Sequence, residues 1–128
     1  MQLLTQETCI KYLEKLRWKG IPTCPYCQST RSTKYRKELR HRCNDCFTSY
    51  SVTVGTLFHR THISLPTWFK AIYLLTEPLP MISVRKLSKV LGVSKNTAFS
   101  IRSRIFQYRK QDPDSLQKIS DFYGKYIR

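Results

Sequence analysis

Four of the five cysteines in this chain are arranged in two close pairs. Cys24 and Cys27 form the first pair, Cys43 and Cys46 form the second, and fifteen residues separate the pairs. Two thiolates three residues apart can bind one metal ion, and a second such pair completes a tetrahedral shell. This spacing is typical of one structural Zn²⁺ held between two knuckles, with no ligand position left open for substrate or water. Disulfides or buried free thiols are the alternative interpretation.

The length and charge of the chain narrow its class. Its 128 residues suffice for one domain, or for two very small ones. Domains of this size are marginally stable, and metal binding would add folding free energy. The chain has 23 Lys and Arg residues against 8 Asp and Glu residues, a formal net charge of +15. Such a chain is expected to bind polyanions, foremost nucleic acid. An anionic membrane surface or an acidic protein partner is the alternative.

The sequence also indicates a cellular compartment. No apolar run approaches the roughly 20 residues of a membrane span, and the N-terminus lacks the apolar stretch of a signal peptide. Paired cysteines stay available to metal in a reducing environment. We therefore expect a cytoplasmic, nucleoid-associated protein with no membrane partner.

The metal ligands must be held by the elements around them, and the first of these is a helix. Residues 5–19 carry apolar side chains at helical spacing. Thr5 is the expected N-cap and Gly20 the expected stop. Cys9 lies inside this helix, far from both pairs, and is interpreted as a small core residue rather than a ligand.

Short extended segments surround the two cysteine pairs. Residues 34–36 and 40–42 flank a candidate turn at 37–39. Residues 47–54 show an alternating pattern that is rich in β-prone side chains. Three short antiparallel strands with a metal at one end describe a zinc ribbon. The pattern therefore predicts a ribbon over residues 21–58.

Beyond the ribbon the pattern becomes helical. Residues 64–76 predict a strongly apolar helix that begins around Pro66 and ends before Pro78 and Pro80. No low-complexity linker separates this helix from the ribbon, so we expect the two modules to pack together.

Residues 82–108 show the pattern of two helices joined by a tight turn. Gly92 supplies the turn, where positive φ is commonly required, and Ser94 caps the second helix. The inward positions are Val84, Leu87 and Leu91 on the first helix, and Ala98, Ile101 and Ile105 on the second. This is a helix-turn-helix signature, although any helical hairpin can show the same stripe.

If the second helix reads DNA, its inward residues determine which side chains point outward. Asn can bond adenine, Lys can donate to guanine and an apolar group can touch the thymine methyl. The expected major-groove face is Lys95, Asn96, Phe99, Ser100 and Ser103, with Arg102 and Arg104 at the flanks and Ser94 and Thr97 on phosphate. The alternative for Phe99 is packing on the 65–76 helix or on a second subunit, and for Asn96 a solvated first turn.

Charge supports this interpretation in two places. Every charged residue between Glu77 and Asp112 is basic. The hairpin between the cysteine pairs is also basic, and its candidate DNA contacts are Arg31, Lys34, Arg36, Lys37, Arg40 and Arg42. Alternating strand charges can also be a solvated face. His59 and His62 are interpreted as capping, packing or phosphate contacts rather than a second metal site.

The order of these motifs resembles the N-terminal part of bacterial insertion-sequence transposases related to the Merlin elements. The segments that carry the resemblance are 16–18, 24–27, 42–46, 53–58, 65–72 and 91–99. It covers roughly residues 5–108 and implies a transposase-like zinc ribbon and a helix-turn-helix that recognise the terminal inverted repeats of a mobile element.

The same resemblance sets an expectation about catalysis. In that family a catalytic domain with three metal-binding acidic residues follows the helix-turn-helix. Here residues 112–128 read as one short capped helix, and Asp112, Asp114 and Asp121 are too close together to replace such a domain. We therefore expect a DNA-binding protein or regulator that is not itself an enzyme.

Taken together, the sequence predicts a small α+β zinc protein. The expected parts are an N-terminal helix (1–20), the zinc ribbon (21–58), a helix-turn-helix module (59–111) and a C-terminal helix (112–128). The expected partner is double-stranded DNA. A homodimer and a catalytic transposase chain acting in trans stay open. The alternative function is a ribbon that binds an acidic protein or RNA.

Overall fold

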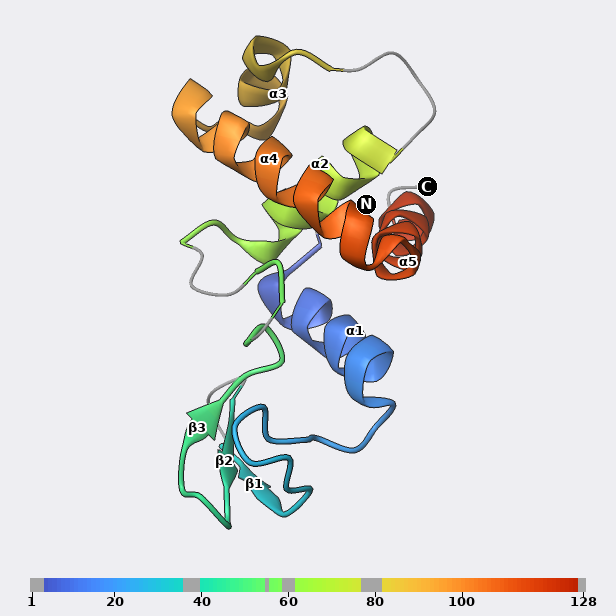
Figure 1. Cartoon of the computed structure of the whole chain (residues 1–128). Coiled ribbons are helices and arrows are strands. Elements are labelled where there is room, and N and C mark those ends of the chain that lie inside the picture. Colours follow the sequence, from blue (N-terminus) through green and yellow to red (C-terminus); the bar gives the residue numbers. More distant parts are fainter. Residues whose placement is uncertain (1–3, 36–39, 55, 59–61, 77–81, 127–128) are drawn as a thin grey trace. The chain divides into compact units, whose positions relative to one another are not determined.

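The computed structural model describes residues 4–35, 40–54, 56–58, 62–76 and 82–126, which form two compact units. Thr5–His62 is one unit, and the described residues from 63 to 126, with Leu4, form the other. The elements, labelled in Figure 1, are α1 (Gln6–Trp18), β1 (Ser32–Lys34), β2 (His41–Cys43), β3 (Ser49–Tyr50), α2 (Leu65–Thr76), α3 (Val84–Leu91), α4 (Lys95–Gln111) and α5 (Pro113–Tyr126). The small α+β fold expected from the sequence is confirmed. Below, the first unit is called the ribbon unit and the second the helical unit.

Helix α1 belongs to the ribbon unit. The Thr5 hydroxyl accepts a hydrogen bond from the Thr8 backbone N–H at 3.1 Å, so the predicted N-cap is confirmed. Cys9 is fully buried, as expected of a core residue. The helix ends at Trp18, and its C-cap Lys19 already has a left-handed φ of 52°, one residue before the predicted stop at Gly20 (φ 95°).

The three strands form an antiparallel sheet in the order β1-β2-β3. Thr33 pairs with Arg42, and His41 pairs with Tyr50. Because side chains alternate across a strand, His41 and Cys43 face the core while Arg42 faces solvent.

The strand expected over residues 47–54 is shorter than predicted. Only Ser49–Tyr50 is extended and paired, and residues 52–54 form a turn. The cause is a tertiary contact that the local pattern does not contain. Arg17 Nη1 donates to the carbonyls of Val52 and Val54 at 2.7 and 2.6 Å, so α1 binds groups that would otherwise extend the sheet. The expected turn at 37–39 lies outside the described residues.

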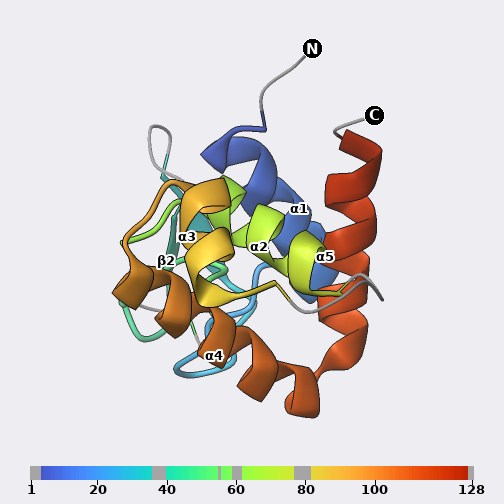
Figure 2. The ribbon, with the colours of Figure 1, turned by 90° about the horizontal axis from the view of Figure 1, so that it is seen from above.

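Helix α2 is the centre of the helical unit. It contacts α3, α4 and α5 (Figure 2), and it buries Leu65, Trp68, Phe69, Ala71 and Ile72. Such an apolar helix is stable only when surrounded, which explains its position. The prolines expected to end it lie outside the described residues.

Helices α3 and α4 are joined by a tight turn, as predicted. Gly92 has a φ of 70° and ends α3. The Ser94 hydroxyl accepts from the Thr97 backbone N–H at 3.1 Å and caps α4. The buried positions include Leu87, Ala98, Ile101 and Ile105, and the half-buried ones Val84 and Leu91. Lys70 of α2 donates to the Val90 carbonyl at 3.3 Å and ties the end of α3 to α2.

Helix α5 completes the helical unit. The Asp112 carboxylate accepts from the backbone N–H and the hydroxyl of Ser115, so the capped helix expected here is confirmed. Gly124 allows close approach to α2, because an added Cβ would lie 3.2 Å from the ring of Tyr73. Among the described residues, none of the helices is both long and apolar enough to cross a bilayer.

Candidate metal centre and nucleic-acid interface

The four paired cysteines converge on one point in the ribbon unit. Their Sγ atoms all lie within 4.8 Å of one another. The Cys24 and Cys46 sulfurs are 3.6 Å apart, and those of Cys27 and Cys43 are 3.4 Å apart. Ligands at about 2.3 Å from a tetrahedral zinc ion would be about 3.8 Å from each other. The cluster therefore has the donors and the size of a closed, four-sulfur metal site.

The two knuckles have the same backbone geometry. The residue after the second cysteine of each pair, Gln28 or Phe47, has left-handed φ, 66° and 63° respectively. Its backbone N–H donates to the carbonyl of the first cysteine of the pair, at 2.9 Å in the first knuckle and 3.0 Å in the second. Backbone N–H groups also point at sulfur, from Tyr26 to Cys24 and from Cys46 to Cys43, both at 3.4 Å. These donors favour thiolates, the form that binds metal.

The electrostatics of the cysteine cluster also favour the binding of a cation. Hydrogen bonds from the hydroxyl and backbone of Thr48 lower the pKa of Cys46 to about 6. The pKa of Cys27 behaves in the opposite way. The Ser29 backbone lowers it, but hydrogen bonding with Cys43, burial, and hydrogen bonding with Cys46 and Cys24 together raise it to about 12. Four adjacent thiolates repel each other, so a divalent ion is what would hold all four deprotonated.

A buried histidine supports the metal centre from the side of α1. His41 is 4% exposed, and its Nε2 lies 2.8 Å from the Glu14 carboxylate. Its ring stacks on Tyr50 at 5.6 Å and meets Trp18 edge-on at 5.3 Å. Tyr50 and Trp18 in turn pack against buried Cys24 and Cys43. This contact joins helix, sheet and metal ligands into one core.

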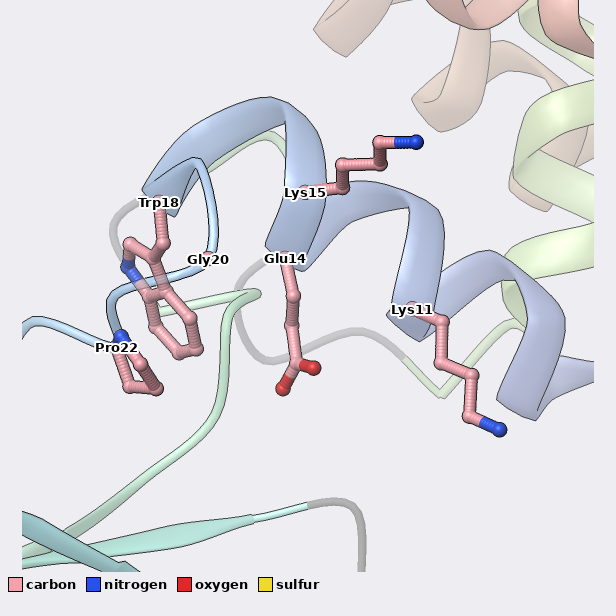
Figure 3. Close-up of a pocket in the computed structure, with 6 residues that line it drawn as sticks. All are labelled: Lys11, Glu14, Lys15, Trp18, Gly20 and Pro22. Carbon is pink, nitrogen blue, oxygen red and sulfur yellow. The ribbon is translucent and has the colours of Figure 1, made fainter.

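Glu14 and Trp18 also line a surface pocket of about 240 Å³, with Lys11, Lys15, Gly20 and Pro22 (Figure 3). The Lys11 and Lys15 ammonium groups point away from the Glu14 carboxylate. The pocket is lined by α1 and the loop after it, and the Glu14 carboxylate is hydrogen-bonded to His41 of β2.

The outward face of α4 has the composition expected from the sequence. Lys95, Asn96, Ser100 and Arg104 are exposed, and Ser103 is half-buried. Phe99 is 61% exposed, so the interpretation that it packs on the 65–76 helix is wrong. Phe99 is exposed because of the helical period: Ala98 and Ile101 occupy the buried face of α4, and Phe99 lies outside that face.

The remaining basic residues of the helical unit are mostly exposed. Arg85, Lys86, Lys89, Arg109 and Lys110 lie at the surface, and within the described part of the chain none of them forms an ion pair. Arg102 differs, because it is half-buried with its guanidinium 5.2 Å from the Phe106 ring centroid. The Arg102 side chain is therefore less exposed than that of Arg104, the other predicted flanking residue.

The basic residues of the ribbon unit differ in exposure and in the contacts they make. Lys34 and Arg40 are exposed. Arg31 is exposed but its Nη1 lies 2.9 Å from the Asp45 carboxylate. Arg42 lies 5.4 Å from the Phe47 ring centroid. Arg36, Lys37 and His59 fall outside the described residues.

Sequence reasoning missed two residues that look basic and act as structural ties, His41 and Arg17. The signal for His41 was present, since a side chain two residues before Cys43 on a strand must share its face. The contacts of Arg17 had no local signal. His62 is exposed, and in the described part of the chain the four-cysteine cluster is the one group of three or more potential ligands that could hold a metal ion.

Comparison with known proteins places the ribbon in a family context. Residues 4–49 match the family model of the transposase zinc-ribbon domain. An uncharacterized protein in transposable element ISH50 of Halobacterium salinarum is 27% identical, over 95% of this chain and 43% of the relative. The chain thus spans less than half the length of that protein. No solved structure matches this chain. These comparisons relate the ribbon of this chain to transposase zinc ribbons, and most of the chain to a protein of a transposable element.

Proposed function

We propose that this protein is a sequence-specific DNA-binding protein of a mobile element. Its α3–α4 pair would bind duplex DNA as a helix-turn-helix, and one Zn²⁺ would stabilise its ribbon unit. The observation that carries the proposal is the outward face of α4. It combines exposed Lys95, Asn96, Phe99, Ser100 and Arg104 on a helix whose opposite face is buried.

The side chains on this face fit base edges. Asn96 lies in the first turn of α4, where a recognition helix meets the bases. Its amide can bond adenine through two hydrogen bonds, Lys95 can donate to guanine, and the Phe99 ring can touch a thymine methyl group. The N-terminus of α4, which Ser94 caps, is a favourable place for a phosphate of the DNA to bind.

The surrounding charge fits a phosphate backbone. The exposed basic residues of α3 and α4 are not neutralised by carboxylates within the described chain, and the 78–111 segment contains no acidic residue. Each phosphate neutralised by such a residue would contribute to affinity and to its salt dependence.

Zinc is the metal that suits the cysteine cluster. Four thiolates at tetrahedral spacing are the donor set of structural zinc, and the site leaves no open position for chemistry. The bound ion would hold the knuckles together and so stabilise the sheet and α1.

The test is selection of bound sequences from random duplex DNA at one fixed salt concentration. The expected result is an enriched motif, and Asn96→Ala should relax one base pair of it, at a cost of about 1–3 kcal/mol. Gln107→Ala is the matched control, because this exposed residue lies about 16 Å farther along the same helix. An unchanged motif in Asn96→Ala would show that α4 does not read the bases.

Two other functions remain as outcomes of the same experiment. Binding that enriches no motif would favour a ribbon that binds an acidic protein or RNA. A motif that is cleaved only when a second chain and Mg²⁺ are added would favour the DNA-targeting part of a split transposase.

A further inference from the structure

The two zinc knuckles carry exposed aromatic rings that the duplex-reading proposal does not use. Tyr26 lies between Cys24 and Cys27 and is 57% exposed. Phe47 follows Cys46 directly and is 65% exposed. Both residues are therefore within one position of a candidate metal ligand in the ribbon unit.

The backbone conformation at position 47 does not favour phenylalanine. Its φ of 63° is a conformation in which glycine is favoured and a bulky side chain costs free energy. The ring also buries little surface, so it gives little hydrophobic stabilisation in return. An exposed aromatic residue held in an unfavourable backbone conformation points to a role in binding.

The Phe47 ring has a cationic neighbour. The Arg42 guanidinium lies 5.4 Å from the Phe47 ring centroid, and Lys34 and Arg40 are exposed on the same small unit. Asp45 is the acidic group nearest in sequence, and it is bonded to Arg31 and Ser29. Phe47 therefore offers an exposed ring beside positive charge.

We propose that the knuckles of the ribbon unit form a second DNA site, which binds unpaired bases by stacking them on Phe47 and Tyr26. Base faces are accessible to a ring only where the strand is not paired, as at a frayed or single-stranded end. Arg42 beside Phe47, and the exposed Lys34 and Arg40 of the same unit, would attract the phosphates of the same strand. A second copy of this chain would bring the same positive charge to the surface and would be repelled.

This site is distinct from the α4 face, so the two can be tested separately. The probe is a fluorescein-labelled single-stranded (dT)12 oligonucleotide, titrated with the zinc-loaded full chain at fixed salt and followed by anisotropy. Phe47→Asn removes the ring and keeps a residue that tolerates left-handed φ. We expect its affinity for the oligonucleotide to fall roughly 5- to 150-fold, and that of Tyr26→Ala to fall in the same direction.

Controls separate stacking from folding and from duplex binding. Phe47→Tyr and Tyr26→Phe keep a ring and should retain the affinity. Phe99→Ala removes an equally exposed ring from the helical unit, and should weaken duplex binding while leaving single-strand binding unchanged. Zinc content and circular dichroism of each variant report whether the ribbon stays folded.

A stacking-specific signal completes the test. An oligonucleotide with one 2-aminopurine should lose emission on binding to the wild-type chain and keep it with Phe47→Asn. Unchanged single-strand affinity in folded Phe47→Asn and Tyr26→Ala would overturn the proposal. So would binding without any change in 2-aminopurine emission, or a change of oligomeric state in place of the loss of affinity. None of these results depends on whether α4 reads a duplex.

Discussion

The pair formed by Glu14 and His41 connects α1 to the sheet, and its disruption has a predictable cost. The two side chains are 2.8 Å apart and only 21% and 4% exposed. His41→Phe keeps a ring beside Tyr50 and Trp18 but leaves the carboxylate without this donor. Hydrogen bonds to charged groups contribute about 1.5–3 kcal/mol, and a stranded charge costs at least as much. We expect the free energy of unfolding of the ribbon unit to fall by about 2–3 kcal/mol.

A double variant isolates the interaction itself. Replacing both partners by apolar side chains of similar size removes the stranded charge along with the bond. His41→Phe combined with Glu14→Leu should therefore recover at least about 1 kcal/mol relative to His41→Phe alone. Glu14→Leu alone completes the thermodynamic cycle.

The chain offers a local reporter for this measurement. It has two tryptophans, Trp18 in the ribbon unit and Trp68 in the helical unit. In a Trp68→Phe background, Trp18 fluorescence follows unfolding of the ribbon unit alone, because its ring contacts His41 and Tyr50 at 5.3 and 5.6 Å. Urea titrations with saturating zinc give the free energies. A loss below about 0.5 kcal/mol, with no coupling in the cycle, would refute the role given to His41.

Two further predictions concern the metal and the α3–α4 turn. Burial raises the pKa of Cys9 to about 12, so its thiol should resist alkylation in the zinc-loaded chain, whereas chelation should unfold the ribbon unit and expose it. Mass spectrometry counts the modified thiols, and a Cys9 still protected after chelation would contradict a structural metal. Gly92→Ala should destabilise the helical unit by about 1 kcal/mol from backbone conformation alone, since an added Cβ meets nothing within 4 Å. Gly92→Asn should cost less, and Trp68 fluorescence during urea unfolding measures both; equal losses would argue against a conformational origin.

Local chemistry made much of this fold predictable. The cysteine spacing, the caps at Thr5 and Ser94 and the turn at Gly92 depend on residues close together in sequence, and the structure has all of them. The buried face of α4 follows from the helical period in the same way.

The features that could not be predicted from the sequence depend on contacts between distant segments. Arg17 binds carbonyls 35 and 37 residues away, and that contact shortens the last strand. His41 sits between Arg40 and Arg42 and was assigned no role, although the alternation of β2 places it on the same face as Cys43. The exposure of Phe99 was left open because its partners could be judged only after α2 and α4 were in place. The grouping of α1 with the ribbon is likewise a tertiary fact.

The measurement that tests the central claim most directly is the specificity ratio of the zinc-loaded chain at one fixed salt concentration. It compares the affinity for the selected duplex with the affinity for a scrambled duplex of the same length and composition. If α4 reads bases, the ratio should be about 10³ or greater. A ratio near one would contradict the account, because the positive charge alone would then explain all of the binding.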